Sequence, residues 1–378
     1  SFTVSLQPSN IEQQSVLDGL GVSTIINAAG PSTRLGGGRA DPEVVSAVAE
    51  AMTSCVAIGP LQERASSIIS EHTGAEAGIV TSGASAALLL AAAACLTGLS
   101  PERMRRLPHV DEKDQILIPR SHRNLYDHAI RAAGAKLVEV GIADRFSGAG
   151  VRDTEAWELG EAIGEHTAAI LYVAQTHSQP PLEQVIEQAR TRNIPVIVDA
   201  AGRLPPKSNL NKFIKAGADL ACFSGGKAIG GPQGTGILCG RRRLVGASAL
   251  QLFDQDVLPE LWKPPVWIAS DSSLPGAPHH GIGRPCKVGK EQIVGLLVAL
   301  QRFVAISDHE RIAGWNLLAK RLLDGINGAP CSAAVTQTND GVPIVTVRPE
   351  EYPALEITRA LQGGEPAIYI NEAGVREG

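Results

Sequence analysis

Short apolar runs recur along the first two thirds of the chain, and polar or glycine-rich positions separate them. Seven of these runs lie at residues 78–80, 116–118, 136–140, 169–173, 195–198, 220–223 and 236–239. Most of them are apolar at nearly every position, which is typical of strands buried on both faces. The pattern therefore predicts seven strands that belong to one central sheet.

Helical patterns lie between these runs. Residues 85–96 are rich in Ala and Leu, residues 182–191 carry apolar side chains at helical spacing, and a third helix is predicted over 125–133. When helices connect successive strands, right-handed parallel crossovers are the default. The predicted fold class is therefore α/β, with a mostly parallel seven-stranded sheet between helices.

The pattern changes in the last third of the chain. Prolines are frequent from residue 259 to 285, and two long helices are predicted over 287–306 and 308–326, followed by strand-like runs at 342–347 and 367–370. This order is typical of a small α+β domain. We predict an N-terminal segment (1–45) that packs on the small domain, a large domain (46–262), a connecting region (263–286) and the small C-terminal domain (287–378).

Composition excludes several classes of protein. The 378 residues are 44% hydrophobic and 19% charged, which excludes a disordered chain, and the net charge of −5 offers no basic face for nucleic acid. The longest apolar stretch, 84–96, is shorter than the roughly 20 residues that cross a bilayer. Six cysteines without a C-x-x-C pair indicate reduced thiols rather than disulfides or zinc ligands. We expect a cytoplasmic protein that binds neither membrane, nucleic acid nor metal.

Two features of the sequence suggest a ligand site. The small residues from Thr81 to Ser85 join a strand to the Ala-rich helix, where free N–H groups at the helix start can bind an anion. Asp199 ends the buried strand 195–198, at the edge where open α/β sheets bind ligands. Each feature also has a purely structural interpretation, as a tight strand-to-helix turn and as a helix cap.

A third feature narrows the chemistry. Lys227 lies in a glycine-dense loop directly after the strand 220–223. A lysine shielded from water can have a lowered pKa, and its neutral amine then forms a Schiff base with a carbonyl group. Together with Asp199, it indicates a cofactor with an aldehyde and a protonated pyridine nitrogen, which describes pyridoxal 5′-phosphate. A ligand-binding α/β protein without this cofactor is the alternative.

The order of these features resembles the fold-type I pyridoxal-phosphate enzymes. In detail the chain resembles their selenocysteine synthase-like family, which includes bacterial L-seryl-tRNA(Sec) selenium transferases and stand-alone relatives such as D-glucosaminate-6-phosphate ammonia-lyase. The motifs that carry the resemblance are Asn27-Ala28-Ala29-Gly30, Leu61-Gln62-Glu63-Arg64-Ala65, Thr73-Gly74-Ala75-Glu76-Ala77, Thr81-Ser82-Gly83-Ala84, Ser224-Gly225-Gly226-Lys227 with Gly230-Gly231-Pro232-Gln233, and Gly283-Arg284-Pro285-Cys286-Lys287-Val288. They lie between about residues 25 and 300.

The resemblance implies roles for individual residues. Lys227 would hold the cofactor, Asp199 would pair with its ring nitrogen, and His122 would cover the ring face; an exposed loop histidine is the alternative for His122. The cofactor phosphate would be bound by Ser82, Gly83, Ala84, Ser85 and Ser224, with Gln233, Thr235, Arg284 or Lys287 reaching it across a dimer interface. Candidates for a substrate carboxylate or phosphate are Arg34, Arg39, Arg120, Arg123, Arg203 and Arg348, which as surface arginines would need no explanation.

The resemblance also implies an activity. We expect a homodimer or larger homo-oligomer that acts at Cα of a small amino acid or amino-sugar acid, by α,β-elimination to a 2-keto acid and ammonia. A racemase or epimerase is the first alternative, and His122 or Cys286 could then act opposite Lys227. Retro-aldol cleavage and a catalytically inactive relative are further alternatives. A selenium transferase is disfavoured, because the resemblance begins near residue 25 and leaves no room for a leading tRNA-binding domain.

Overall fold

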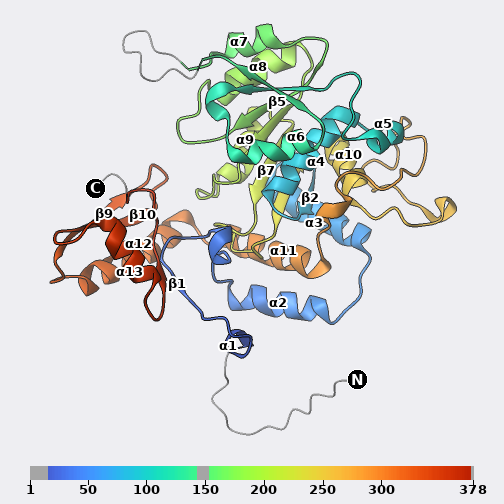
Figure 1. Cartoon of the computed structure of the whole chain (residues 1–378). Helices are drawn as coiled ribbons and strands as arrows, with labels where there is room; N and C mark the ends of the chain where they lie inside the picture. Colours follow the sequence, from blue (N-terminus) through green and yellow to red (C-terminus); the bar gives the residue numbers. More distant parts are fainter. Residues whose placement is uncertain (1–15, 143–152, 376–378) are drawn as a thin grey trace.

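A seven-stranded sheet forms the centre of the molecule, for which a computed structural model describes residues 16–142 and 153–375 (Figure 1). Its strand order is β2-β8-β7-β6-β5-β3-β4. The strands are β2 (Ala77–Thr81), β3 (Gln115–Pro119), β4 (Lys136–Val140), β5 (Thr167–Val173), β6 (Val196–Asp199), β7 (Leu220–Ser224) and β8 (Gly236–Gly240). All seven predicted strands are present, which confirms the predicted fold class.

One strand departs from the parallel default. β8 runs antiparallel to both of its neighbours, β2 and β7, whereas the other pairings are parallel. The physical reason is the connection: β7 ends at Ser224 and β8 begins at Gly236, and the loop between them contains no helix that could carry the chain back across the sheet.

Two rows of helices cover the sheet. One row contains α4 (Ala84–Thr97), which contacts α5 (Pro101–Arg106), α6 (His128–Ala132) and α10 (Arg242–Leu252). The other contains α3 (Ile58–Thr73), α9 (Asn209–Ala216), α8 (Leu182–Thr191) and α7 (Ala156–Ala162), each in contact with the next. α4 is buried at most of its 14 positions, and its Ala-rich sequence favours a helix at almost no cost in side-chain entropy.

One helix differs from its prediction. The segment 125–133 forms a 3₁₀ turn, η3 (Leu125–Asp127), followed by the short helix α6, rather than one continuous helix. Asn124 caps this turn by accepting from the N–H of Tyr126 at 2.7 Å. A side chain that satisfies the first free N–H in this way starts a new turn at this position.

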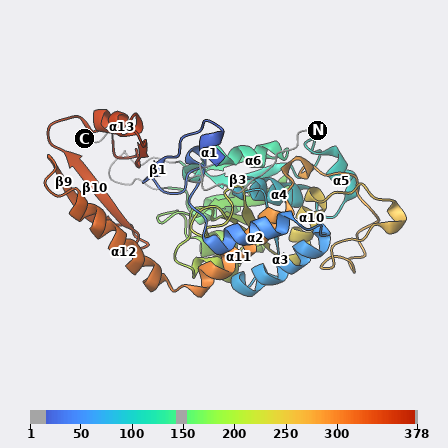
Figure 2. The ribbon, with the colours of Figure 1, turned by 90° about the horizontal axis from the view of Figure 1, so that it is seen from below.

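The C-terminal third contains two long helices, α11 (Lys290–Ala305) and α12 (Asp308–Gly325). Figure 2 shows α2 (Pro42–Met52) beside α11, and α12 along the antiparallel hairpin of β9 (Cys331–Gln337) and β10 (Pro343–Pro349). The chain continues through α13 (Ala354–Gln362) to β11 (Ile368–Tyr369), which pairs with β1 (Ile26–Asn27). Sequence reasoning missed β9, whose small and polar residues are largely exposed.

Contacts between the ends of the chain bear on its domain organisation. β1 belongs to the predicted N-terminal segment and pairs in parallel with β11, while α11 packs on α2 and α3 and joins the main core through Ile293, Leu296 and Leu300. The three boundaries between the four predicted segments stay a prediction, and part of the N-terminal segment lies outside the described residues. Within the described part of the chain, no helix has the length and apolar character that crossing a membrane requires.

Candidate active site

The three predicted features meet at one edge of the sheet. Thr81 of β2 and Ser224 of β7 both pair with Gly236, so the turn after β2 and the lysine loop after β7 begin side by side. On the other side of β7, Cys222 pairs with Asp199, the last residue of β6. This is the carboxyl edge of the parallel strands, where open α/β sheets bind ligands.

Asp199 is the buried carboxylate of this edge. It is 8% exposed, and its Oδ1 accepts from the N–H of Ala201 at 3.0 Å. Burial raises the pKa of Asp199, although the Ala201 hydrogen bond and the charge of Lys227 oppose this change. Across residues 16–142 and 153–375, no hydrogen bond reaches its Oδ2. A protonated pyridine nitrogen fits this carboxylate, because it would supply both a hydrogen-bond donor and a positive charge to a group that has lost its water.

The turn after β2 has the form of an anion cradle. Gly83 has a φ of 93°, a conformation that favours glycine, and it precedes the first turn of α4, whose leading N–H groups lack partners within the helix. A Cβ on Gly236 would lie 2.5 Å from the carbonyl carbon of Gly83, so glycine is required there. The Ser82 hydroxyl donates to the carbonyl of Cys286 at 2.7 Å. The turn therefore presents the free N–H groups of a helix start, which can bind a phosphate.

Of the remaining predicted phosphate ligands, Ala84 and Ser85 begin α4, where Ser85 is exposed, and Ser224 is half-buried at the end of β7. The loop that follows Ser224 folds back on itself: Gly225 donates to the carbonyl of Thr235 at 2.8 Å, and Gly231 donates to that of Gly225 at 2.9 Å. Because these contacts fix both ends of the loop, Lys227 stays on the same edge as Asp199.

Lys227 itself is exposed, whereas the sequence suggested a lysine shielded from water. Gly225 and Gly226, which precede it, are themselves buried, and a Cβ on Gly226 would lie 2.6 Å from Cα of Gln233, so glycine is required at that position too. The charge of Lys227 lowers the pKa of Asp199, so the amine is close enough to this carboxylate to interact with it.

His122 ends the 3₁₀ turn η2 (Arg120–His122) and is 4% exposed, so it is not an exposed loop histidine. The N–H of Val173 donates to its Nδ1 at 3.2 Å, which places the ring proton of a neutral imidazole on Nε2. The ring meets Tyr172 edge to face, with centroids 4.7 Å apart. Because Val173 pairs with Asp199, His122 lies beside the strand that holds the carboxylate.

Most of the predicted substrate arginines have carboxylate partners. Arg120 and Arg123 both meet Glu139 on the edge strand β4, and Arg34 meets Glu372 at 3.1 Å. Arg348 is exposed on β10, and Arg39 is exposed in the N-terminal segment.

Arg203 lies four positions after Asp199. Its Nη2 meets Asp340 at 3.2 Å, and its Nη1 donates to the hydroxyl of Thr176 at 3.2 Å. It therefore joins the loops that follow β5 and β6 to the β9–β10 hairpin.

Three of the four residues predicted to reach across a dimer interface, namely Gln233, Thr235 and Arg284, make side-chain hydrogen bonds within this chain. Gln233 Nε2 donates to the hydroxyl of Thr33 at 3.2 Å, and Arg284, in η5 (Arg284–Cys286), bonds to Asp254. Lys287 is exposed. Burial raises the pKa of Cys286, which keeps its thiol protonated.

Sequence reasoning missed that Gln62 and Ser66 on α3 position β2, although it noted the motif that contains Gln62. Gln62 on α3 is fully buried, and its amide exchanges two hydrogen bonds with the backbone of Val80, at 2.8 and 2.9 Å. Ser66, one helical turn later, accepts from the N–H of Gly78 at 3.0 Å. β2 is an edge strand, so no further strand bonds to its outer side. Gln62 and Ser66 supply hydrogen bonds to its backbone instead, and they thereby fix the position of the turn that follows it. Polar residues spaced by four within an apolar helix face were the available signal.

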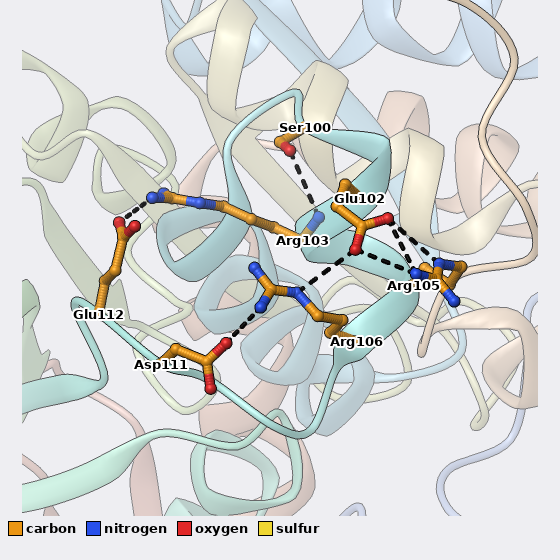
Figure 3. A network of polar contacts seen from close by, with 7 residues as sticks. All are labelled: Ser100, Glu102, Arg103, Arg105, Arg106, Asp111 and Glu112. Carbon is orange, nitrogen blue, oxygen red and sulfur yellow. Dashed lines mark hydrogen bonds and ion pairs between the residues drawn. The ribbon is translucent and has the colours of Figure 1, made fainter.

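A cluster of arginines on α5 lies away from this edge, beside a cavity of about 710 Å³ that Arg103, Arg105 and Arg243 help to line. Figure 3 shows how the cluster is neutralised: Arg103 meets Glu112, Arg105 meets Glu102, and Arg106 meets both Glu102 and Asp111. Exposed pairs of this kind contribute about 0–1 kcal/mol each. With its charges balanced, the cluster is a poor candidate for binding an anionic ligand.

The sheet with its single antiparallel strand, the aspartate at the end of β6 and the lysine after β7 define a fold-type I pyridoxal-phosphate enzyme. Residues 25–250 match the model of the SelA family, described as L-seryl-tRNA selenium transferase. The chain belongs to this family.

Several relatives are similar over most of the chain. It is 32% identical to a 5′-C-glycyluridine monooxygenase-decarboxylase from Streptomyces, over 93% of this chain and 83% of the relative. It is 30% identical to D-glucosaminate-6-phosphate ammonia lyase from Salmonella typhimurium, over 98% and 91%. An L-seryl-tRNA(Sec) selenium transferase from Actinobacillus pleuropneumoniae is 30% identical over 65% of this chain and 55% of its own length.

Solved structures agree with this assignment. A structure of D-glucosaminate-6-phosphate ammonia-lyase has a TM-score of 0.77 and 29% identity, covering 97% of this chain and 92% of that one. The aminotransferase PseC of Helicobacter pylori, with a TM-score of 0.51 and 15% identity, shares the fold alone.

Proposed function

We propose that this chain is a pyridoxal-phosphate-dependent lyase that releases ammonia from a β-hydroxylated amino acid or amino-sugar acid. The observation that carries the proposal is the buried carboxylate of Asp199 on the same sheet edge as the accessible amine of Lys227. Similarity to an ammonia lyase over 98% of this chain supports the reaction type. The acidic net charge of the chain supports a small-molecule substrate rather than tRNA.

The residues divide the work as follows. When bound, pyridoxal phosphate withdraws electrons from Cα of the substrate and acidifies its C–H bond. The turn at Ser82–Ala84 would offer backbone donors to the phosphate, and the carboxylate of Asp199 would keep the ring nitrogen protonated. His122 would lie against the ring. Lys227 would hold the cofactor through its amine, and the same amine, once free, would remove the Cα proton as a general base.

The proposed reaction balances without an external oxidant or reductant. Lys227 takes the Cα proton, and the Cβ hydroxyl leaves as water after it receives a proton. Tautomerisation and hydrolysis, which returns one water, then release the 2-keto acid and ammonia. No C–C bond breaks, and the overall oxidation state of the substrate carbons is unchanged, because the oxidation at Cα is matched by reduction at Cβ.

A second candidate function is oxygen-dependent decarboxylation of an amino acid. It is favoured by the 32% identity to the Streptomyces monooxygenase-decarboxylase, which covers 93% of this chain. Racemisation shares the loss of the Cα proton but needs an acid on the face opposite Lys227. The protonated thiol of Cys286 and the Nε2–H of His122 are the groups available for it. Retro-aldol cleavage would break the Cα–Cβ bond instead.

One experiment separates these reactions. A panel of amino acids and amino-sugar acids is incubated with the holoenzyme in deuterated water, while oxygen uptake is followed. We expect ammonia and 2-keto acid in equal amounts, one solvent deuterium at Cβ and no oxygen uptake. Oxygen uptake with release of CO₂ would instead favour decarboxylation. Deuterium at Cα with inverted configuration and no ammonia would overturn elimination in favour of racemisation.

We also propose a homodimer or a larger assembly of dimers. The phosphate turn supplies backbone donors but no cation, so a positive group from elsewhere would complete the site. Arg284 is the candidate for this role: it is paired with Asp254 at the surface, its side chain is 29% exposed, and it would exchange this partner for the phosphate of the neighbouring subunit. Light scattering is expected to give at least twice the chain mass, and Arg284→Gln is expected to weaken cofactor binding. An active monomer at working concentration would contradict the proposal.

A further inference from the structure

The tip of the β9–β10 hairpin lies against the candidate site. Thr338 closes the turn: its N–H donates to the carbonyl of Val342 at 2.9 Å, and its carbonyl accepts from Gly341 at 2.8 Å. Gly341 has a φ of 78°, which favours glycine. Asn339 and Asp340 therefore form the tip of a tight turn, and their side chains project from it.

Both side chains of the tip contact loops at the carboxyl edge of the central sheet. Asp340 meets Arg203, which follows β6, and Asn339 Nδ2 donates to Nε2 of His177, which follows β5, at 3.0 Å. The hairpin is thus attached to the loops that flank Asp199 by two polar contacts. These contacts join parts of the chain 137 and 162 positions apart.

The charge of Arg203 is permanent and partly shielded from water. Its side chain is 16% exposed, and that of Asp340 is 25% exposed. The backbone of Arg203 is fixed, because its N–H donates to Ala200 at 3.0 Å and its carbonyl accepts from Asn209 Nδ2 at 2.6 Å. The guanidinium has Asp340 as its ion-pair partner and the neutral Thr176 as its other side-chain partner. The backbone of Arg203 is therefore fixed, and its charge is balanced by Asp340 at the tip of the hairpin.

We propose that Asp340 competes with the substrate for the guanidinium of Arg203. The anionic group of the substrate, a carboxylate or a phosphate, takes the guanidinium of Arg203 in place of the Asp340 carboxylate, and the hairpin tip is released from the sheet edge. An arginine already paired with a carboxylate attracts a second anion weakly, whereas a freed guanidinium offers a bidentate fork to either group. Asp340 thereby lowers the affinity of the site for anionic substrates. It is a positioning residue that acts through Arg203.

This inference rests on the proposed function only in requiring an anionic substrate. Its test uses inorganic phosphate as the probe and the holoenzyme as the protein, so that the phosphate of the cofactor already fills the turn after β2. Titration calorimetry measures phosphate binding, and amide hydrogen exchange over residues 338–342 measures release of the tip. Neither measurement needs turnover, so this test can still be interpreted if the protein proves not to be an ammonia lyase.

We expect Asp340→Asn to bind phosphate about tenfold more tightly than the wild type, because loss of a competing charge worth about 1.4 kcal/mol is a factor of ten. The control Asp324→Asn removes an exposed charge from α12 and should bind as the wild type does. Arg203→Gln should abolish binding, and phosphate should speed exchange at 338–342 in the wild type but not in Arg203→Gln. Unchanged or weaker binding by Asp340→Asn would overturn the proposal, as would an equal gain in Asp324→Asn.

Discussion

Replacing Lys227 with alanine is expected to lower turnover by about 10²–10⁴-fold, the range that a positioned general base contributes. Lys227 lies in a loop closed by the Gly225–Thr235 hydrogen bond, on the same edge as Asp199. Its loss removes both the amine that holds the cofactor and the base that takes the Cα proton. The measurement is kcat with the best substrate of the panel, together with the yellow absorption of the holoenzyme.

The attachment site is tested directly by borohydride reduction followed by peptide mapping. The pyridoxyl group should be found on Lys227. Lys212→Ala is the matched control, because Lys212 is an exposed lysine on α9 and its loss should change neither colour nor turnover. Recovery of the label on Lys207, Lys212 or Lys215 would refute the role of Lys227.

Replacing Asp199 with asparagine is expected to lower turnover by about 100-fold while the cofactor still binds. The carboxylate of Asp199 is buried, and burial raises its pKa. A neighbouring cation such as the protonated ring nitrogen would favour its charged form. Removing one partner of a buried pair costs about 3 kcal/mol, which is about two factors of ten in rate when the loss falls on the transition state. Cofactor binding persists because the turn at Ser82–Ala84 and Lys227 are unchanged.

A second buried carboxylate provides the control for this experiment. Asp219 precedes β7 at the opposite edge of the sheet, where it accepts from the N–H of Val196 at 2.7 Å and meets Arg241 at 2.6 Å. Asp219→Asn should lower the melting temperature without changing the turnover of the folded protein. Near-normal turnover in Asp199→Asn, or an equal loss in both variants, would show that Asp199 has no special part in the reaction.

The order of elements and the central chemistry were accessible from the sequence. Strands buried on both faces leave uninterrupted apolar runs, so all seven strands of the sheet were predicted. The residues at the ends of those strands follow from the same pattern, so the sequence alone places Asp199 and Lys227 at one edge of the sheet. The shorter and more exposed elements left a weaker signal: β9 was missed, and the segment 125–133 was predicted as one helix.

Only the tertiary structure decided which charges meet. Arg34, Arg120, Arg123 and Arg203 were equivalent as cations in the sequence, but their partners Glu372, Glu139 and Asp340 lie on elements that fold against them. His122, which could have been an exposed loop histidine, is buried and accepts a hydrogen bond from Val173, whereas Lys227, expected to be shielded, is exposed. The local pattern of apolar residues determines which faces of a strand or helix are buried, and the order of these elements indicates the fold. Contacts between residues far apart in the chain determine which polar groups lose water and which partners they gain.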